Sequence, residues 1–341
     1  TVSGNVTLGC LTTARRAITS YTYREKIKKA IGAVCEQRRM TRITVEPAHP
    51  AGDSAEAFTD LMRDAWDGIP DEEVIPPHVF TAAGETGNLL AAHSDGELVG
   101  FCYQMPDTTR DATLYSHAVG VAEAYQGRGV GERLKWAQRE HALARGFETI
   151  RWTYDPLLGG NAKLNVRKLG ATVSEYETAL YDTDNDASSG ETPDDRFVVS
   201  WELQRDRVVR RAAAASASTV DQSTRSDTTS DSPSTPDGPP DDEPVVLLSA
   251  RGPELAVAES PAVERVGDDS EFAFTLDSVE SETVTVQVPQ DREETETADT
   301  EHDWRYATRE TFTALFERGY TVTDFRVDPD DHNSYVLEAE R

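Results

Sequence analysis

The chain has 341 residues, a formal net charge of −28 and a hydrophobic content of 37%, which is low for a single fully packed globule. So acidic a chain repels nucleic acid and anionic membranes, and no apolar run approaches the roughly 18 residues of a membrane span, so we expect neither partner. The three cysteines, Cys10, Cys35 and Cys102, are scattered, which excludes a disulfide framework and a cysteine metal site and points to a cytoplasmic protein.

Charge is unevenly distributed along the chain. Residues 1–39 contain eight Lys and Arg against two Asp and Glu, whereas residues 212–341 contain nine against 31. Only six of the 34 basic residues are Lys. This composition is typical of salt-adapted cytoplasmic proteins, because a high surface charge retains water when salt screens other interactions. We therefore expect a halophilic protein, and an acidic mesophilic protein is the alternative.

Residues 1–39 differ from the rest of the chain because they are basic. Met40 directly precedes a predicted strand at residues 41–45. We therefore expect Met40 to be the native start and residues 1–39 to be a non-native or disordered leader. A transit peptide is the alternative, because the segment is rich in Arg, Ser and Thr and poor in acidic residues.

Residues 40–205 alternate strand and helix signals, which predicts one α+β domain in which helices pack on a mixed sheet. Within it, Asp95-Gly96 supplies the positive φ angles of a tight hairpin turn. The predicted elements in chain order are a strand at 41–45, a helix at 55–66, a short helix after Pro77, strands at 89–93, 98–104 and 112–121, a helix at 129–146, a strand at 147–154, a short helix at 161–169, and strands at 172–180 and 197–203.

A glycine-rich loop joins the predicted strand at 112–121 to the predicted helix at 129–146. It reads Gln126-Gly127-Arg128-Gly129-Val130-Gly131. Unpaired amides and a positive dipole at a helix N-terminus attract anions, and glycines let an anion approach the backbone. The loop is therefore predicted to bind a diphosphate.

Three phosphate-binding patterns can be compared with this loop. A Walker loop ends in Gly-Lys-Ser or Gly-Lys-Thr, whereas Gly131 is followed by Glu132. A dinucleotide fold requires Gly-x-Gly-x-x-Gly, which the spacing of Gly127, Gly129 and Gly131 does not fit. The third pattern, Gln/Arg-x-x-Gly-x-Gly/Ala, does fit.

That third pattern is the coenzyme A (CoA) loop of the GNAT superfamily of N-acetyltransferases. Residues 121–131 resemble the junction of the fourth strand and third helix of that family, and the order of elements over residues 40–205 is similar. The resemblance implies the GNAT fold, in which the fourth and fifth strands separate around acetyl-CoA, the co-substrate, and it implies no metal. The residues that it assigns to acyl-CoA are Val119, Val121, Gln126, Gly127, Arg128, Gly129, Val130, Gly131 and Asn161.

A narrower resemblance involves residues 151–157, Trp201 and the C-terminal segment 304–320. These are similar to an uncharacterised prokaryotic GNAT branch, and together with the acidic composition they imply a haloarchaeal source. The sequence also departs from the common GNAT pattern. Many members have a Tyr on the fourth helix that protonates the departing thiolate, but residues 165–170 contain no Tyr. Either another residue supplies the proton, the thiolate leaves unprotonated, or catalysis is absent.

Four residues are candidates for the chemistry of transfer. His117 shares strand parity with the residues that line the expected CoA arm, and its ordinary pKa near 6.5 suits a general base. Glu123 can act through water, while Tyr154 and Asp155 lie where the fifth strand ends. Each has a plainer interpretation as a packed histidine, a solvated loop carboxylate or part of a turn at Asp155-Pro156.

Residues 206–244 are rich in Ala, Ser, Thr, Asp and Pro and are predicted to form a disordered acidic linker. Residues 245–341 regain strand and helix signals and are predicted to form a smaller C-terminal α+β part. It is either a degenerate second GNAT-like half or an unrelated module. Its predicted elements are strands at 245–248, 272–276 and 284–288, a solvated acidic loop at 291–303, a helix at 304–316, and strands at 320–327 and 335–338.

Taken together, the sequence favours a cytoplasmic acyl-CoA-dependent N-acyltransferase that uses acetyl-CoA and acts on a small amine or amino acid by direct transfer. The alternative is a non-catalytic acyl-CoA-binding module whose C-terminal part contacts a partner protein. The glycine loop supports both, and the absent Tyr supports the second. The sequence leaves the acceptor and the oligomeric state open.

Overall fold

The structure of the protein is a computed structural model. It describes residues 43–49, 54–66, 68–178, 194–222, 245–248, 263–265, 272–274, 281–289, 298–327 and 333–339. The predicted leader at residues 1–39 and the predicted start at Met40 lie outside the described residues. The chain divides into two compact units, residues 1–44 with 93–97 and residues 45–92 with 98–341.

The smaller unit contains the hairpin turn that the sequence predicts. Asp95 and Gly96 have φ angles of 53° and 86°, so both adopt the left-handed conformation of a tight turn. This confirms the prediction from the Asp-Gly pair.

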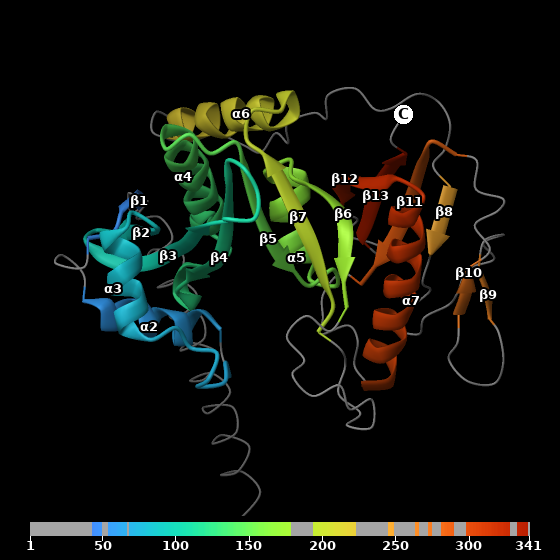
Figure 1. Ribbon diagram of the computed structural model, residues 1–341, viewed down its shortest axis with the longest axis horizontal. Helices are drawn as coiled ribbons and strands as arrows, with labels where there is room; N and C mark the ends of the chain where they lie inside the picture. The colour runs from blue at the N-terminus through green and yellow to red at the C-terminus, as the bar shows by residue number, and fades with distance from the viewer. Residues whose placement is uncertain are drawn as a thin grey trace, which may run out of the picture. The chain divides into compact units, whose positions relative to one another are not determined.

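A mixed sheet forms the framework of the larger unit (Figure 1). Its strand order among the described residues is β1-β2-β3-β4-β5-β7-β6-β12-β13-β11-β8. From β3 onward the neighbouring strands are antiparallel, except that β4 with β5 and β11 with β8 are parallel. The strands are β1 (Ile43–Pro47), β2 (Leu89–Ser94), β3 (Glu97–Pro106), β4 (Thr113–Val121), β5 (Thr149–Tyr154), β6 (Thr172–Glu177), β7 (Arg196–Glu202), β8 (Val245–Leu248), β11 (Thr283–Val288), β12 (Tyr320–Arg326) and β13 (Asn333–Ala339), with β9 (Val263–Arg265) and β10 (Phe272–Phe274) as a separate pair.

Helices of the larger unit lie beside this sheet (Figure 1). They are α2 (Ala55–Ala65), α3 (Pro77–Glu85), α4 (Val130–Ala144), α5 (Gly159–Ala162), α6 (Asp206–Gln222) and α7 (Ala298–Glu317), with a 3₁₀ turn η1 (Glu123–Tyr125) and a π-helical segment η2 (Lys163–Lys168). The combination of a mixed, mostly antiparallel sheet with flanking helices is the predicted α+β class.

The first hydrophobic cluster lies under α2 and α3. Ser54 caps α2, its side chain accepting a hydrogen bond of 3.2 Å from the amide of Ala57. Phe58 of α2 stacks on Phe80 of α3 at 5.5 Å, and Phe80 meets Phe101 of β3 edge-on at 5.3 Å. This packing fixes the two helices against the β3 side of the sheet, next to β4.

The parallel pairing of β4 with β5 is short. The register covers only residues 113–115 and 149–151, ending at Tyr115 opposite Arg151. Both strands continue beyond that point, β4 to Val121 and β5 to Tyr154. The two strands therefore separate halfway along β4, as the resemblance implies.

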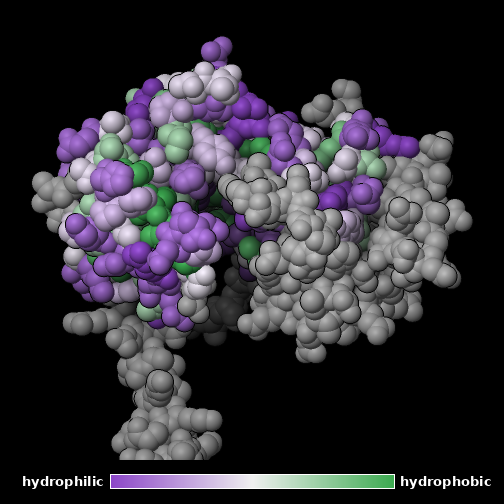
Figure 2. Space-filling view, turned by 60° about the horizontal axis from the view of Figure 1, so that its bottom comes forward, coloured by the Kyte–Doolittle hydropathy of each residue, from purple (hydrophilic) through white to green (hydrophobic). Residues whose placement is uncertain are grey.

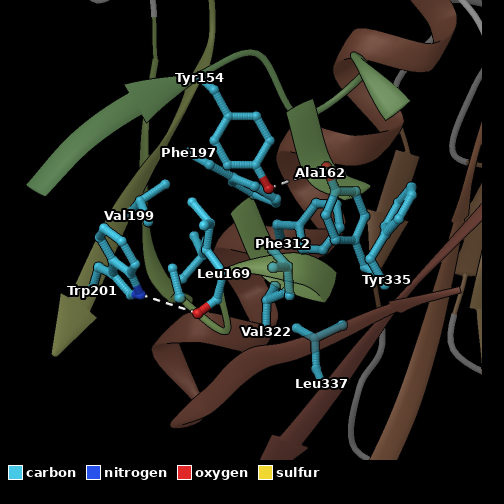
Figure 3. Packing of buried hydrophobic residues seen from close by; sticks show 14 of the residues in the cluster. Tyr154, Ala162, Leu169, Phe197, Val199, Trp201, Phe312, Val322, Tyr335 and Leu337 are labelled. Carbon is cyan, nitrogen blue, oxygen red and sulfur yellow. Dashed lines mark hydrogen bonds between the residues drawn. The ribbon is translucent and has the colours of Figure 1, made fainter. Parts of the chain in front are cut away.

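The second hydrophobic cluster joins the two ends of the larger unit (Figure 3). Phe197 of β7 lies 4.7 Å from Phe312 of α7 and 5.3 Å from Tyr335 of β13, and those two rings lie 5.4 Å apart. Val173 of β6 pairs with Val322 of β12, which extends one sheet through both parts. The predicted C-terminal part therefore shares its core with β5, β6 and β7.

Part of the predicted linker was wrong. Residues 206–222 form α6, because an Ala-rich run has high helix propensity and Val208 buries its side chain. Arg207 donates to the carbonyl of Thr323, and Arg211 donates to the carbonyl of Val166, so α6 contacts both β12 and η2. The remainder of the predicted linker, residues 223–244, lies outside the described residues.

The predicted acidic loop at 291–303 was also wrong at its end, because α7 begins at Ala298. Acidic residues are favourable in the first turns of a helix, where they oppose the positive end of its dipole. In the pair of β9 with β10, the strand β10 was predicted and β9 was not, because Val263–Arg265 is a short strand in a weakly patterned segment.

Truncation of Phe312 tests the shared core. Phe312→Ala should lower the free energy of unfolding by about 3–5 kcal/mol, because it removes a fully buried ring. Tryptophan fluorescence, measured in a Trp304→Phe background so that only tryptophans of the first part contribute, should report the same single, shifted denaturant transition as far-ultraviolet circular dichroism. Val327→Ala, at an exposed position, is the control and should change stability by less than about 0.5 kcal/mol. An unshifted tryptophan transition in Phe312→Ala would show that the two parts fold independently.

Candidate active site

The loop before α4 has the geometry that an anion site requires. Gly127 and Gly129 have φ angles of 71° and 80°, in the region that favours glycine. Gly129 is the N-cap of α4, and no side chain makes a capping hydrogen bond there. A Cβ at either glycine would meet nothing within 4 Å. Among the described residues, the N-cap makes no side-chain capping hydrogen bond, and a side chain at either glycine would point into open space.

Gly131 adds a second indication. A Cβ there would make only ordinary contacts, 3.8 Å from Val121 and 4.0 Å from Leu164. Neither packing nor a positive φ angle requires a glycine at this position. Close approach of a ligand to the first turn of α4 is a physical reason for it.

Hydrogen bonds fix this loop against neighbouring elements. The side-chain amide of Gln126 donates to the carbonyls of Val121 at 3.1 Å and Ala65 at 3.2 Å. The amide of Glu123 donates to the carboxylate of Asp64 at 3.0 Å. Gln126, predicted to contact acyl-CoA, thus holds the loop between β4 and the end of α2, while its glycine neighbours face open space.

The charges around the loop favour an anion. Glu132 in the first turn of α4 would repel one, but its carboxylate accepts a hydrogen bond of 2.6 Å from Lys168 of η2. The guanidinium of Arg128 is exposed and lies 5.5 Å from the ring centre of Tyr125. The helix dipole and Arg128 therefore act on an anion, while the charge of Glu132 is largely compensated.

The backbone of β4 beyond Tyr115 is paired on one side. Val119 lies opposite Cys102 and Val121 opposite Gly100 of β3. On the side of β5, no strand among the described residues pairs with this stretch. Its peptide groups can therefore accept an extended amide chain as an added strand, and this chain would end at the glycine loop.

Asn161, the last residue predicted to contact acyl-CoA, is exposed on α5. The chain continues directly into η2, where Asn165 and Val166 are buried. π-Helical turns often occur at functional sites. The segment lies directly before β6, in the position where the resemblance places the fourth helix.

His117 lies on the stretch of β4 beyond the last pairing with β5. Its ring is exposed and lies edge-on to Tyr103 at 5.4 Å and tilted to Tyr115 at 6.4 Å. Partial desolvation by the surrounding protein lowers the pKa of His117 below its ordinary value of 6.5. The imidazole is therefore mainly neutral at pH 7, which is the state that a general base requires.

The other three catalytic candidates differ in exposure: one is exposed and two are buried. Glu123 begins η1 and is exposed beside the loop. Tyr154 is buried, and burial together with the charge of Asp155 raises the pKa of Tyr154. Asp155 is also buried and binds Arg305 through both carboxylate oxygens, at 2.7 and 2.8 Å. Their contacts account for Tyr154 and Asp155 as parts of a buried network.

A buried polar cluster beneath β4 was not predicted. Lys135 of α4 is 3% exposed, its ammonium lies 3.6 Å from the ring centre of Trp152, and it donates to Ser116 at 3.2 Å. The thiol of Cys102 lies 4.0 Å from the same hydroxyl. Burial lowers the pKa of Lys135 to about 8. Ser116 and Trp152 directly follow the last paired residues of β4 and β5, so this ammonium lies beneath the point where the strands separate.

The sequence contains only a weak signal for Lys135. The residue occupies an inward position one residue after Leu134, where a helix that packs on a sheet has an apolar residue. A lysine inside an apolar stripe is usually assigned to the solvent face, so the pattern alone does not find it.

Residues 55–159 match the family model described as Acetyltransferase (GNAT) family. No curated protein sequence matches the chain significantly. Among solved structures, similar folds include yncA, a putative acetyltransferase from Salmonella typhimurium in a structure with its cofactor acetyl-CoA. The two sequences are 18% identical, the match covers 48% of this chain and 95% of that chain, and the TM-score is 0.40. Diaminobutyrate acetyltransferase EctA from Paenibacillus lautus, in complex with L-2,4-diaminobutyric acid and coenzyme A, has 16% identity, 49% and 98% coverage, and a TM-score of 0.38. An N-acetyltransferase from Staphylococcus aureus Mu50 has 16% identity, 48% and 100% coverage, and a TM-score of 0.40.

Over residues 55–159, the chain therefore matches an enzyme domain of the N-acetyltransferase class. The fold of the sheet and helices around the loop is the GNAT fold, with additional C-terminal strands and α7.

No group of three or more His, Cys, Asp or Glu in the described ranges could hold a metal ion. Across the same part of the chain, no helix is both long enough and apolar enough to cross a membrane. Figure 2 shows the described surface on one face as mainly hydrophilic, as the acidic composition predicts.

Substitution of Lys135 tests its burial. The folded-state pKa of about 8 lies below the ordinary value of 10.5, so the stability that Lys135 contributes is complete above pH 10.5 and is lost as pH falls through 8. The free energy of unfolding of Lys135→Met should therefore change less with pH than that of the wild type between pH 7 and 10.5. The difference between the two changes should reach up to about 3 kcal/mol. Urea denaturation across this range measures the difference.

The exposed Lys163 provides a matched control. Lys163→Met should follow the wild-type curve of stability against pH. If Lys135→Met also follows that curve, the ammonium is solvated and the buried cluster is not correctly described.

Proposed function

We propose that this protein transfers an acyl group from acetyl-CoA to a small amine or amino acid, without a metal. The observation that carries the proposal is that β4 separates from β5 beside the uncapped N-terminus of α4, within the segment that matches the GNAT family. The GNAT structures from Salmonella typhimurium and Paenibacillus lautus contain acetyl-CoA and CoA respectively. The residues on both sides of the separation fit such a ligand.

Acyl-CoA binding follows from two features. The diphosphate is held by the backbone amides of the loop from Gly127 to Gly131, supported by the dipole of α4 and by Arg128. The pantetheine arm pairs with the edge of β4 at Val119 and Val121, where the carbonyl of Val121 also accepts a hydrogen bond from Gln126. Asn161 contacts the arm from α5. Acetyl-CoA supplies the activated acyl group: the amine nitrogen bonds to the carbonyl carbon, the carbon–sulfur bond breaks, and CoA leaves as a thiolate that solvent protonates.

The chemistry is assigned to β4. His117 accepts the proton that the acceptor ammonium must lose before it can attack, either directly or through one water. Tyr103 and Tyr115 flank His117, and their rings favour an approaching ammonium group. Glu123 can relay the proton to solvent because it is exposed beside the loop. We place the protein in the cytoplasm, where acetyl-CoA is made and used.

Gly129→Asp tests the anion site. A carboxylate at the N-cap should repel the diphosphate, and CoA affinity measured by calorimetry should fall at least about 100-fold, which corresponds to ~2.7 kcal/mol. Gly146→Asp is a matched control because Gly146 has nearly the same φ angle, 82°, and open space at the other end of α4. It should bind CoA as the wild type does. Unchanged affinity in Gly129→Asp, with the fold intact, would refute the site.

His117→Gln tests the base. The rate of acyl transfer to an amine should fall by about 100-fold or more, with the KM for acetyl-CoA nearly unchanged. In the wild type, kcat/KM should decrease with falling pH at a pKa below 6.5, because only the neutral imidazole accepts a proton. That decrease should vanish in the variant. CoA release from a panel of small amines measures both, and wild-type protein that binds CoA but never releases it from acetyl-CoA would favour a binding module.

A further inference from the structure

Four strands on each side of the contact between β6 and β12 follow one another in the same order of connection. From the pair of β6 with β12 outward, one side runs β6-β7-β5-β4 and the other runs β12-β13-β11-β8. On each side the first two pairings are antiparallel and the outermost is parallel. In chain order both sides also place helical residues between the second and third strands, α5 with η2 in one case and α7 in the other (Figure 1).

The register of the strands repeats as well. Val173 lies opposite Val199, and the register then shifts by one residue in β6. Val322 lies opposite Leu337, and the same shift follows in β12. Val173 and Val322, equivalent in the two halves, are paired with each other. A pseudo-twofold axis therefore passes between these two valines, which lie in the core shown in Figure 3.

The sequence supports the same alignment. Gly170 ends η2 with a φ angle of 78°, and Gly319 follows α7 with a φ angle of 81°. From these glycines, Gly-Ala-Thr-Val-Ser-Glu-Tyr at residues 170–176 aligns with Gly-Tyr-Thr-Val-Thr-Asp-Phe at residues 319–325. Phe-Val-Val at residues 197–199 likewise aligns with Tyr-Val-Leu at residues 335–337. Gly, Thr and Val are identical at equivalent positions, and the other differences are conservative except for Ala171, which aligns with Tyr320.

The described residues of the second half contain no equivalent of the proposed acyl-CoA site. In this alignment Tyr154 of β5, opposite Phe197, corresponds to Val286 of β11, opposite Tyr335. β8 remains paired with β11 at Val284–Val286, whereas β4 has already left β5 at the equivalent residues. The sequence after β8 contains no Gly-x-Gly.

The contacts between the halves are not symmetric. Arg305 of α7 binds both carboxylate oxygens of Asp155, but the residue equivalent to Asp155 is Gln287. Arg309 binds Asp195 at 2.6 and 2.8 Å, and the hydroxyl of Tyr335 donates to the carbonyl of Pro156 at 2.8 Å. These contacts are therefore specialised and are not a consequence of the symmetry.

Arg305 and Tyr335 act on the turn that leads from β5 to α5. Asp155 also accepts a hydrogen bond of 2.9 Å from the amide of Leu157. The amide of Leu158 donates to the carbonyl of Asp155, and the amide of Asn161 donates to the carbonyl of Leu158. Burial opposes the charge of Arg305, yet its bonds to Asp155 outweigh this and raise the pKa of Arg305. The turn is thus held from α7 through a permanent ion pair.

We infer that residues 283–339 are a second, cofactor-free copy of the half-domain at residues 149–203, and that Arg305 of this copy is a positioning residue for the turn at residues 155–161. The positioning role rests on the proposed function, because Asn161 on that turn is assigned to acyl-CoA. The duplication does not depend on it. The second copy pairs with the edge of β6 through β12, and from there it holds the working half in position.

Hydrogen exchange of the full chain tests the duplication. The amides of β6 and β12 should be protected to the same degree and should exchange together, because they form one continuous sheet at the axis. Rapid exchange throughout β12 while β6 stays protected would overturn it.

The ion pair is tested by removing both partners. Arg305→Met alone leaves a buried carboxylate without its partner and can unfold the chain, so the informative variant is Arg305→Met with Asp155→Asn. Amide exchange at residues 157–161 should become about tenfold faster, and the Kd for CoA should rise about tenfold, while exchange in β11 and β13 stays at its wild-type rate. Arg205→Met, which removes an exposed ion pair with Glu202, should change neither quantity.

Three results separate the possible failures. Wild-type exchange and CoA affinity in the double variant would overturn the positioning role. Faster exchange at residues 157–161 with unchanged CoA affinity would show a purely structural ion pair and would also overturn it. Wild-type protein that does not bind CoA would refute the proposed function, whereas joint protection of β6 and β12 would still support the duplication.

Discussion

The first amides of an α-helix have no partner inside the helix, and in α4 the N-cap residue, Gly129, has no side chain that could supply one. That constraint organises the site. Gly127 and Gly129 adopt positive φ angles that keep side chains away from these amides, while Gln126 and Glu123 tie the loop to β4 and α2. The strand that leads into the loop has lost its neighbour β5 by the same point. In the proposed complex, an anion that carries an extended amide chain binds the first amides of α4 and the unpaired side of β4 at once.

Separated strands must be held apart by the rest of the fold. On one side, β4 is paired with β3, which packs under α2 and α3 through Phe58, Phe80 and Phe101. On the other side, β5 is paired with β7, whose Phe197 contacts Phe312 and Tyr335. The C-terminal elements therefore stabilise one wall of the site. The buried pairs of Arg305 with Asp155 and Arg309 with Asp195 define the geometry of that wall more than they add stability.

Local signals in the sequence were sufficient for much of the fold. Alternating burial in β7, the Asp95-Gly96 turn and the glycine loop before α4 each depend on residues close together in the chain. Tyr154 and Asp155 were predicted to take part in the chemistry, and their buried contacts were not predicted. Arg305 lies 150 residues away from Asp155, so no local pattern reveals that this carboxylate has a buried partner.

Other differences have physical causes of the same kind. The Ala-rich run at residues 206–217 has a composition that suits either a linker or a helix, and burial of Val208 with the contacts of Arg207 decides for the helix. Lys135 carries a charge in an apolar stripe, and only the positions of Trp152 and Ser116 show that it points inward. The catalytic assignments of His117, Glu123, Tyr154 and Asp155, and the acyl-CoA contacts, remain predictions that concern a ligand.

Backbone amide chemical shifts during titration with CoA test the central claim most directly. The account predicts that the largest changes occur at residues 127–131, with a second group along β4 at residues 117–121 and near Asn161. It also predicts no comparable change along β8 or β11, because the second half has no separated strands. Changes centred on β8, β11 or α7, or no change at residues 127–131 at saturating CoA, would contradict it.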